Sequence, residues 1–564
     1  MKLLQRIRPL LPFLGWPRPT RASLLQDLWA GITVGLVLIP QAVAYAALAG
    51  MPPETGLYAA LLPAVIGILW GSAPLLAVGP VALTSLLTYG SLASMAAPGS
   101  ASWVALAIWL SLYSGLIQFA LGAFRLGRIA NLVSQPVMTG FINAAAIIII
   151  LSQLPALTGL EGANTLGTLS AALAGAAPHV LLSTGFGLGA LLLLYAFKRL
   201  LPAFPGMLAV SALGIAASIA IDYAGMGGAV VGAIPAGLPS LHWPPAIPLA
   251  SHQELWPAAL VLALISFTEA MSSCKALSRK RNERWDENQE LLGQGMAKVA
   301  SGFTGAFPVS GSFSRSALNL YAGAQSAWAT LVATLCVLFS LLFLTDLIRH
   351  LPRAVLAAMI MMPVFSLLDF RAVRRIFKVS RLDGVIAVVT FAVTLSSIPR
   401  LHWGVVAGVG LTMGAFLYRR TAPRIIEVSL HGDGTLRDRA RFQLPPLAPD
   451  LLAVRIDAAL NFLTSAALQR FINDRSREAP HVRRVLLCAS GINDIDTTGT
   501  DALAQLKASL EAEGIELYLS AVKKQVTEML EKAGFVAALG PERFFPTDNA
   551  AVAALSGRVP GTRA

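Results

Sequence analysis

The sequence is short of charge. Only 13% of its 564 residues are Asp, Glu, Lys or Arg, whereas 55% are hydrophobic. Soluble domains carry about 25% charged residues, so this composition excludes an ordinary soluble protein and indicates a membrane protein. Cysteine is also scarce: Cys274, Cys336 and Cys488 lie far apart, without a CxxC spacing. This pattern argues against a disulfide framework and against a metal site.

Acidic residues are outnumbered, because 43 Lys and Arg against 30 Asp and Glu give a net charge of +13. The basic residues are not interleaved with aromatic residues, so we expect no nucleic-acid partner. In a membrane protein such an excess instead accumulates at the cytoplasmic ends of the spans. The sequence also lacks a nucleophile–base pair and a phosphate-binding glycine loop. It therefore does not predict an enzyme or a bound cofactor.

Long stretches carry no charge at all, from Ala30 to Pro53 and from Thr55 to Phe124. A membrane-spanning helix needs about 20 apolar residues, so the second stretch holds several spans. Hydropathy along the whole chain predicts fourteen transmembrane segments. They lie near 30–48, 56–71, 77–92, 103–123, 131–154, 178–197, 206–222, 256–274, 291–305, 313–325, 327–345, 354–369, 383–398 and 403–418.

Loop charges orient these spans. Basic clusters precede the first span and follow the fourth, sixth, eighth, twelfth and fourteenth, all on one side. Basic loops face the cytoplasm, and Arg349, Arg353 and Arg400 in two outer loops do not outweigh the pattern. We therefore predict a multi-pass protein of a bacterial inner membrane, in contact with lipid, with both termini cytoplasmic. Residues 1–28 form a cytoplasmic segment and residues 29–420 the transmembrane domain.

The composition changes after about residue 425. The segments "LLAVRIDAAL", "RRVLLCAS" and "ELYLSAV" read as strands, and amphipathic helical patterns separate and follow them. Alternating strands and helices predict a small α/β domain. We place this cytoplasmic domain at residues 446–564, after a linker at 421–445.

Several spans are interrupted. Pro40 falls inside the first, Gly79-Pro80 opens the third, and Pro308, Gly311 and Ser312 interrupt the tenth. Broken backbone at membrane depth is tolerated where it lines a protein cavity, and paired breaks in two halves of a transporter mark its binding site. A polar residue precedes each break at similar spacing, Gln41 before Gly79 and Glu269 before Gly311. Two seven-span halves therefore predict an inverted repeat, with the third and tenth helices meeting near the midplane.

Two facing helix N-termini make an anion site, because each carries about half a positive charge and unpaired N–H groups. Ser312, Ser314 and Arg315 add hydroxyls and a cation at this point. An alternative is that the serines only satisfy the backbone of a kinked helix. Gln41 and Tyr45, one helical turn apart, are expected to face the same cavity. Their alternative role is an ordinary polar contact between helices.

Glu269, in "LISFTEAMSS", is an ionisable carboxyl inside a predicted span. Such a residue is costly in a membrane and marks a functional site by default. A buried carboxyl can carry a proton together with an anion. The alternative is a structural ion pair with Lys275 or Arg315.

Three stretches resemble the sulfate permease (SulP) family of anion transporters, kin of the solute-carrier anion exchangers, over essentially the whole chain. They are "PQAVAYAALAG" with "PPETGLYAA", "GSAPLLAVGPVALTSLL" and "DENQELLGQGMAKVASGFTGAFPVSGSFSRSALN". The resemblance implies a seven-plus-seven inverted repeat, in which a core of spans 1–4 and 8–11 moves against a gate of spans 5–7 and 12–14, elevator-style. It also implies a homodimer.

By match to the family's motifs, the substrate pocket takes residues from the first, third and tenth spans. A carboxyl at the position of Glu269 is associated in several members with proton coupling. Sodium-coupled bicarbonate members have an aspartate earlier in that span, whereas "LVLALIS" has none here, which weakens a sodium reading. The anion site implied by these matches comprises Gln41, Tyr45, Gly79, Val81, Ala82, Ser312, Phe313, Ser314 and Arg315.

The C-terminal segment resembles a STAS domain, related to anti-sigma-factor antagonists. Those relatives carry a phosphorylatable serine in "DSSG", and this chain has "DIDTTG", with Thr497 at that place. A phosphate there is favoured by the following helix N-terminus. The alternative role of Thr497 is a helix cap. A cytoplasmic protein is a candidate partner of this domain.

These features together predict a secondary active anion transporter, with proton-coupled sulfate uptake as the first hypothesis. The anion is held between the N-termini of spans 3 and 10, and the proton is co-transported. A dicarboxylate or bicarbonate transporter of the same fold is the alternative. An anion channel and a sensor that signals through the cytoplasmic domain stay open.

Overall fold

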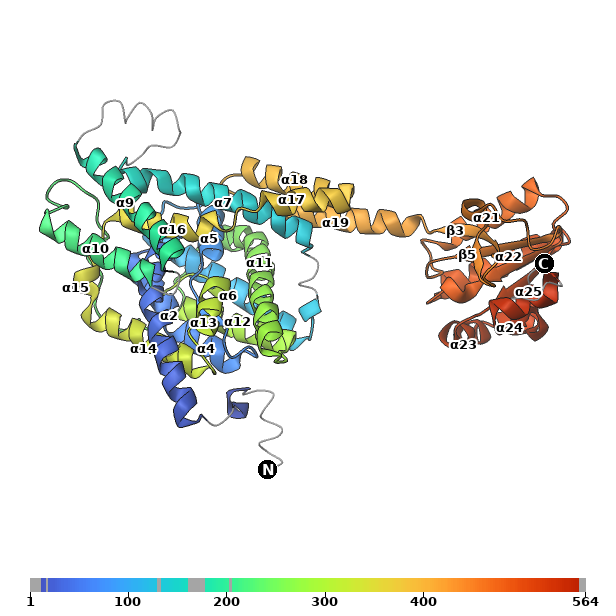
Figure 1. The fold of residues 1–564 in the computed structure, drawn as a ribbon, viewed down its shortest axis with the longest axis horizontal. Coiled ribbons are helices and arrows are strands. Elements are labelled where there is room, and N and C mark those ends of the chain that lie inside the picture. Colours follow the sequence, from blue (N-terminus) through green and yellow to red (C-terminus); the bar gives the residue numbers. More distant parts are fainter. Residues whose placement is uncertain (1–11, 17–18, 129–132, 161–177, 202–204, 557–564) are drawn as a thin grey trace. The chain divides into compact units, whose positions relative to one another are not determined.

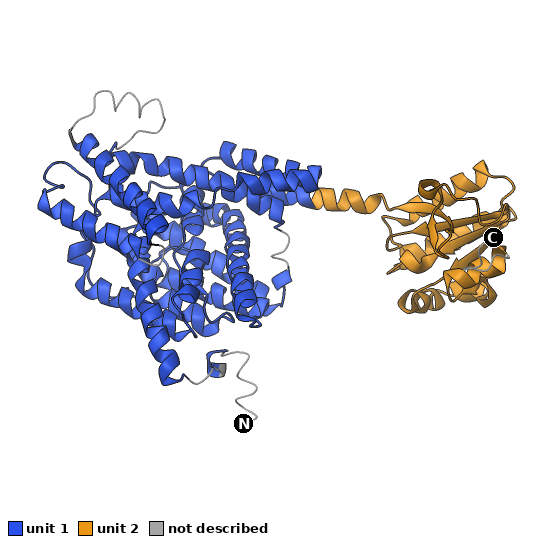
Figure 2. Cartoon of the chain, in the orientation of Figure 1, with its two compact units in different colours: residues 1–412 blue, residues 413–564 orange. Residues whose placement is uncertain are grey.

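The computed structural model describes residues 12–16, 19–128, 133–160, 178–201 and 205–556. The chain divides into two compact units, residues 1–412 and 413–564 (Figure 2). The boundary falls inside helix α19 (His402–Thr421).

The first unit is helical, with two short strands (Figure 1). Each of the fourteen predicted ranges overlaps one of its helices. Besides the 3-10 turn η1 (Pro12–Gly15) and α19, its elements are α2 (Arg21–Leu48), α3 (Pro53–Ala59), α4 (Leu62–Trp70), β1 (Ala77–Gly79), α5 (Ala82–Leu92), α6 (Ala101–Ala123), α7 (Gln135–Thr158), α9 (Pro178–Leu200), α10 (Gly206–Ala220), α11 (Leu249–Arg281), α12 (Glu287–Phe303), β2 (Ser310–Ser312), α13 (Phe313–Tyr321), α14 (Trp328–Phe343), α15 (Thr345–Ile348), α16 (Arg353–Phe365), α17 (Phe370–Val379) and α18 (Arg381–Ser396).

Not every helix of the first unit is long enough to cross a membrane. Within the described residues, seven helical stretches are long and apolar enough to cross a membrane. They are Arg21–Leu48, Pro53–Trp70, Ala101–Ala123, Gln135–Thr158, His179–Leu200, Leu249–Arg281 and Arg353–Val379. The apolar helices α10 and α14 are shorter.

Packing sorts these helices into two groups. In the first, α6 packs on α11 and α12, α12 on α4, and α14 on α2. In the second, α7 packs on α9, α16 and α18, and α9 on α10 and α16. Helix α2 also contacts α10 and α16, so it borders both groups. Each group therefore combines helices from the two halves of the sequence.

Glycine permits a close contact between α6 and α12. A Cβ added to Gly295 would lie 2.5 Å from the backbone nitrogen of Phe119 and 2.7 Å from the carbonyl oxygen of Gly115. Real Cβ atoms essentially never approach so closely, so both helices need small residues here. The two backbones are thereby held in direct contact.

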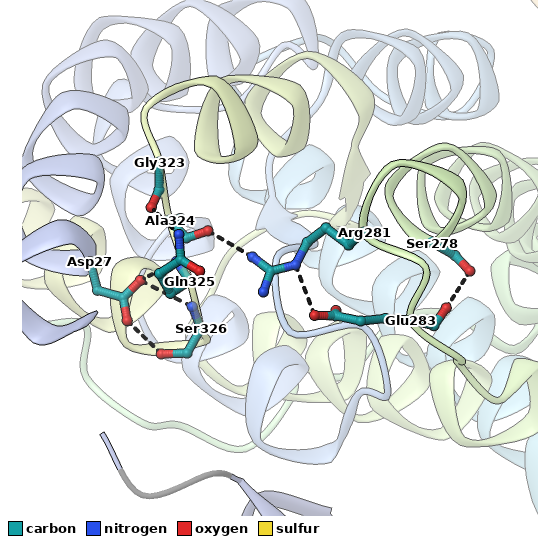
Figure 3. A network of polar contacts seen from close by, with 8 residues as sticks. All are labelled: Asp27, Ser278, Arg281, Glu283, Gly323, Ala324, Gln325 and Ser326. Carbon is teal, nitrogen blue, oxygen red and sulfur yellow. Dashed lines mark hydrogen bonds and ion pairs between the residues drawn. The ribbon is translucent and has the colours of Figure 1, made fainter. Parts of the chain in front are cut away.

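A polar network joins three segments of the first group (Figure 3). The buried Asp27 carboxylate of α2 accepts hydrogen bonds from the backbone N–H groups of Gln325, at 2.6 Å, and Ser326, at 3.0 Å. It also accepts one from the Ser326 hydroxyl, at 2.5 Å. Arg281, in the last turn of α11, donates to the Ala324 carbonyl oxygen at 3.0 Å and pairs with Glu283 at 2.8 Å. The turn before α14 is thus fastened to α2 and α11.

The second unit is a six-stranded sheet in the order β4-β3-β5-β6-β7-β8. Strands β5 (Leu451–Ile456), β6 (Arg484–Cys488), β7 (Glu516–Ser520) and β8 (Phe544–Phe545) run parallel. The three predicted strands are confirmed as β5, β6 and β7. Helices of the unit are α20 (Arg439–Phe442), α21 (Ser465–Glu478), α22 (Thr497–Ala512), α23 (Lys524–Lys532), α24 (Phe535–Leu539) and α25 (Asp548–Ser556), with 3-10 turns η3 (Ala489–Gly491) and η4 (Pro541–Arg543).

Three sequence-based expectations differ from the structure. Residues 421–445, expected as a linker, contribute β3 (Ile425–Leu430) and β4 (Leu436–Asp438), and β3 pairs antiparallel with β5. Pro40 does not break its span, since α2 runs through it without interruption. The sequence of the charged run 278–290, "SRKRNERWDENQE", predicts a solvated cytoplasmic loop, but its last residue, Glu290, is 1% exposed in α12.

We expect Asp27→Ala to lower the free energy of unfolding by about 3 kcal/mol, because three donors would lose an ionised acceptor. Thermal unfolding of the purified protein in detergent measures the effect. Glu254→Ala, at an exposed acid of α11, is the matched control and should leave the melting temperature unchanged. Equal melting temperatures for Asp27→Ala and the wild type would contradict the role assigned to this network.

Candidate functional site

The two interrupted segments lie side by side. Strands β1 and β2 pair antiparallel, with Ala77 opposite Ser312, Val78 opposite Gly311 and Gly79 opposite Ser310. Helices α5 and α13 begin within three residues of these strands, at Ala82 and Phe313. The two breaks predicted from the glycines and prolines are therefore adjacent in space, and two helix N-termini flank them.

Side chains hold the extended backbone of this pair. The Ser316 hydroxyl of α13 accepts a hydrogen bond from the Ala77 N–H at 2.9 Å, and the Asn319 amide donates to the Leu75 carbonyl oxygen at 3.4 Å. On the other strand, the Ser310 hydroxyl donates to the Ser266 carbonyl oxygen of α11 at 2.9 Å. Non-helical backbone inside an apolar unit persists only when its polar groups are satisfied in this way.

Glu290 fastens the segment that leads into β1. Its carboxylate accepts from the Ser72 N–H at 2.9 Å and the Ala73 N–H at 3.1 Å, and from the Gln294 amide at 3.0 Å. Asp286, four residues before Glu290, caps α12 by accepting hydrogen bonds from the Asn288 and Gln289 N–H groups. The motif "DENQE" thus attaches the segment before β1 to α12.

Arg315 is the central cation. The residue is 1% exposed, and its Nε and both Nη atoms have no hydrogen-bond partner among the described residues. A Cβ added to Gly79 would lie 3.3 Å from Nη2, so the guanidinium lies against the Gly79 backbone. Arginine keeps its charge at any ordinary pH, and an uncompensated buried charge is strongly unfavourable. The arrangement is therefore suited to holding an anion.

Serine side chains at the start of α13 divide between two roles. The Ser312 hydroxyl caps the helix by accepting from the Arg315 N–H, at 3.4 Å, and lies 3.3 Å from the Ser314 hydroxyl. Ser314 is exposed, and Phe313, at 54% exposed, lines a cavity of about 110 Å³ with Ser273, Lys280 and other residues. Capping explains Ser312, whereas Ser314 is free to face a ligand.

Residues predicted on the first and third spans are buried beside this pair. Val81 is the N-cap of α5 and Ala82 its first residue, at 4% and 9% exposed. Tyr45 is 5% exposed on α2, which contacts both α5 and α13. Gln41 makes a different contact, because its amide lies 3.0 Å from the Met207 sulfur of α10. Its Oε1 is buried and finds no hydrogen-bond partner in the part of the chain that the structure describes.

Glu269 lies on α11, and its carboxylate is near enough to Arg315 and Lys298 to interact with their charges. Its Oε2 is buried and has no hydrogen-bond partner in the described part of the chain. The ion pairs of the described residues include none between Glu269 and Lys275 or Arg315, and Lys275 is exposed. The structural ion pair considered for Glu269 is therefore not formed.

Sequence reasoning missed Lys298. This residue of α12 is completely buried, and its ammonium donates to the Gln118 amide oxygen at 2.8 Å and to the Ser266 hydroxyl at 3.0 Å. The available signal was a lone lysine inside the predicted span 291–305, facing a lone glutamine in the span 103–123. Both lie in the first group of helices.

Thr497 lies at the start of α22 in the second unit, and its side chain is exposed. The helix cap is the preceding residue, since the Asp496 carboxylate accepts from the Gly499 N–H at 2.7 Å. The capping role considered for Thr497 is therefore wrong, and its hydroxyl faces solvent. Of the described residues, no three His, Cys, Asp or Glu gather where they could hold a metal ion.

Comparison with known families matches nearly the whole chain. The family model described as sulfate permease family covers residues 24–390, and the STAS domain model covers residues 446–551. A probable sulfate transporter of Mycobacterium tuberculosis is 32% identical over 95% of this chain and 96% of its own length. The chloroplastic sulfate transporter 4.1 of Arabidopsis thaliana is 30% identical over 97% of this chain and 82% of its own.

Solved structures share the fold. The murine Solute Carrier 26 family member A9 anion transporter, in the inward-facing state, superposes with a TM-score of 0.88 at 22% identity, over 98% of this chain and 95% of its own. The transmembrane domain of a cyanobacterium bicarbonate transporter, BicA, superposes with a TM-score of 0.59 at 24% identity, over 70% of this chain and 99% of its own.

We expect Gly79→Ala to weaken sulfate binding at least tenfold, about 1.4 kcal/mol. The new methyl group would crowd the Arg315 guanidinium, and the backbone φ of +154° is strained for any other residue. Sulfate-induced stabilisation in thermal unfolding measures binding. Gly232→Ala is the matched control, because Gly232 has a φ of +88° but open space around it. Equal losses in both variants would assign the effect to backbone strain and not to Arg315.

Proposed function

Because the chain belongs to the sulfate permease family, whose members are transporters and not enzymes, we propose that it is a secondary active anion transporter that takes up sulfate together with a proton. The observation that carries the proposal is the buried Arg315 guanidinium, which has no partner among the described residues and lies against Gly79. Two helix N-termini flank it. This is the charge arrangement that a small oxyanion requires.

Sulfate is favoured over other anions because several relatives of the whole chain are named as sulfate transporters. The same cation, hydroxyl and N-terminal dipoles would also hold a dicarboxylate or bicarbonate, and the fold is shared with a protein named as a bicarbonate transporter. An anion channel would use the same site within a continuous pore. Substrate and transport mode are separated by the experiment below.

Proton coupling follows from the charge of the substrate. Moving a dianion into a cell against a negative-inside potential costs about 2.3 kcal/mol per charge per 100 mV. Cotransported cations offset this cost. Glu269 is the proton carrier in this proposal, because its carboxylate lies within electrostatic range of Arg315 but forms no ion pair with any cation of the described residues. A proton bound there lessens the repulsion between the carboxylate and the anion.

An elevator mechanism fits the grouping of the helices. The first group, with α2 to α6 and α11 to α14, carries the proposed anion site and acts as the core. The second group, with α7, α9, α10 and α16 to α19, acts as the gate. We propose that the fourteen helical segments form the seven-plus-seven inverted repeat and that Gln41–Met207 is a core–gate contact that breaks when the core moves.

The proposed setting is a homodimer in a bacterial inner membrane, with cytoplasmic termini. The second unit then lies in the cytoplasm, where the exposed Thr497 hydroxyl is accessible to a kinase. A phosphate there would lie at the N-terminus of α22, which favours negative charge. We propose that this unit regulates transport through a cytoplasmic protein partner.

We expect radiolabelled sulfate to accumulate in proteoliposomes when an inward proton gradient is imposed. Glu269→Gln should abolish gradient-driven accumulation, because a neutral amide cannot carry a proton. Sulfate exchange without a gradient should persist in the variant, since the anion site is intact. Lys275→Gln, at an exposed lysine on the same helix, is the control and should behave as the wild type.

Each other outcome has a definite meaning. Uptake of fumarate or bicarbonate but not sulfate would replace the substrate. Voltage-driven anion current without proton flux would replace the transporter by a channel. Gradient-driven accumulation that survives Glu269→Gln would remove the carboxylate from proton coupling.

We expect phosphate on Thr497 when the protein is purified from its native membrane and analysed by mass spectrometry. Thr497→Ala should remove the phosphopeptide signal, whereas Thr498→Ala, at the exposed next residue, should keep it. Phosphate found on Thr498 alone, or on neither threonine, would contradict the regulatory role of Thr497.

A further inference from the structure

Lys298 is a completely buried cation of α12. It is 0% exposed, and its ammonium has two neutral acceptors, the Gln118 amide oxygen at 2.8 Å and the Ser266 hydroxyl at 3.0 Å. The Gln118 amide in turn donates to the Ala263 carbonyl oxygen at 2.7 Å. These bonds orient the ammonium but do not neutralise it.

A buried ammonium without a nearby anion is strongly unfavourable. No ion pair of Lys298 occurs among those of the described residues, and the carboxylate that interacts with it electrostatically is Glu269. Glu269 follows Ser266 by three positions on α11, so both lie on the same face of that helix. The free energy of burying Lys298 therefore depends on whether Glu269 is ionised.

Lys298 is also connected, through hydrogen bonds, to the β1–β2 strand pair of the proposed anion site. Ser266 accepts from the ammonium through its hydroxyl and from Ser310 through its carbonyl oxygen, at 2.9 Å. Ser310 is paired with Gly79, which lies against the Arg315 guanidinium. Ser266 and Ser310 thus link Lys298 to the strand pair beside Arg315, inside the protein, where electrostatic interactions are weakly screened.

We propose that Lys298 is the second fixed cation of the transport site. In the empty site its charge is balanced by ionised Glu269. When Glu269 takes up a proton, Lys298 and Arg315 together balance the two negative charges of a bound dianion. This inference rests on the proposed function and deepens it, because it makes Lys298 a determinant of specificity for a dianion that travels with a proton.

The charged and titratable groups around Glu269 are consistent with this balance. Helix α12 contributes Lys298, α13 contributes Arg315, and α2 contributes the Tyr45 phenol. At Ser266, three positions before Glu269 on α11, α6 contributes the neutral Gln118 amide and β2 the Ser310 hydroxyl. Of these groups Glu269 is the acid and Lys298 the cation that touches only neutral partners.

A double-variant cycle tests the proposal without any substrate. Melting temperatures of the purified full-length protein are measured at pH 7.5 for the wild type, Lys298→Gln, Glu269→Gln and the double variant. Glutamine keeps a donor for Gln118 and Ser266. We expect Lys298→Gln to lower the melting temperature by several degrees in the wild type but not in the Glu269→Gln background, where the lysine charge has no counter-charge to balance.

The pH dependence of the same measurement separates charge from structure. The loss caused by Lys298→Gln should be larger at pH 8.5 than at pH 5.5, because a protonated Glu269 no longer needs a cation. An equal loss at both pH values and in both backgrounds would make Lys298 a structural residue and overturn the proposal. Failure of Lys298→Gln to fold counts for the proposal if the double variant folds, and against it if both fail.

Transport supplies the second readout. Lys298→Gln should reduce sulfate exchange at least tenfold while a monovalent anion, bicarbonate, is affected less, and Lys275→Gln should change neither. Equal losses for both anions would contradict the specificity role. If the wild type moves no sulfate, the proposed function fails, but the melting-temperature cycle still decides whether Lys298 balances Glu269.

Discussion

The pairing of two short strands inside a helical unit is the constraint on which the rest of the first unit depends. Extended backbone surrounded by apolar side chains has N–H and C=O groups that must find partners within the protein. Strands β1 and β2 pair with each other through their backbones. The side chains of Ser310, Ser316 and Asn319 form further hydrogen bonds with backbone groups in and around the pair. Because the strands come from the two halves of the sequence, the pairing also requires those halves to interleave.

The helices around the strands meet this requirement by close packing and by charge. Direct backbone contact between α6 and α12 is possible only with glycine at Gly115 and Gly295. The carboxylates of Asp27 and Glu290 accept hydrogen bonds from backbone N–H groups in turns. Without these carboxylates the N–H groups would be unpaired. Together these contacts hold the strand pair against its neighbouring helices.

Much of this arrangement could be predicted from the sequence, because its signals are local. Charge-free stretches give the spans, Gly79-Pro80 and Pro308 to Ser312 give the breaks, and alternating patterns give β5 to β7. Pro40 misled this reasoning, since proline can be accommodated within a continuous helix when neighbouring groups satisfy the freed carbonyl. Lys298 and Glu290 could not be assigned, because their roles depend on partners that lie more than 170 residues away, Gln118 and Ser72.

The Gly79 backbone against Arg315 has a consequence for how such a site can be retuned. In the proposed anion site, the Gly79 main chain and the Arg315 guanidinium form the floor, and a β-carbon added at Gly79 would lie 3.3 Å from the guanidinium. A main-chain floor offers the same hydrogen-bonding groups whatever residues surround it. In the proposed site, selection among anions of different size or charge therefore falls to the surrounding side chains, with Val81 and Phe313 among those proposed, and to the proposed charge balance between Lys298 and Glu269.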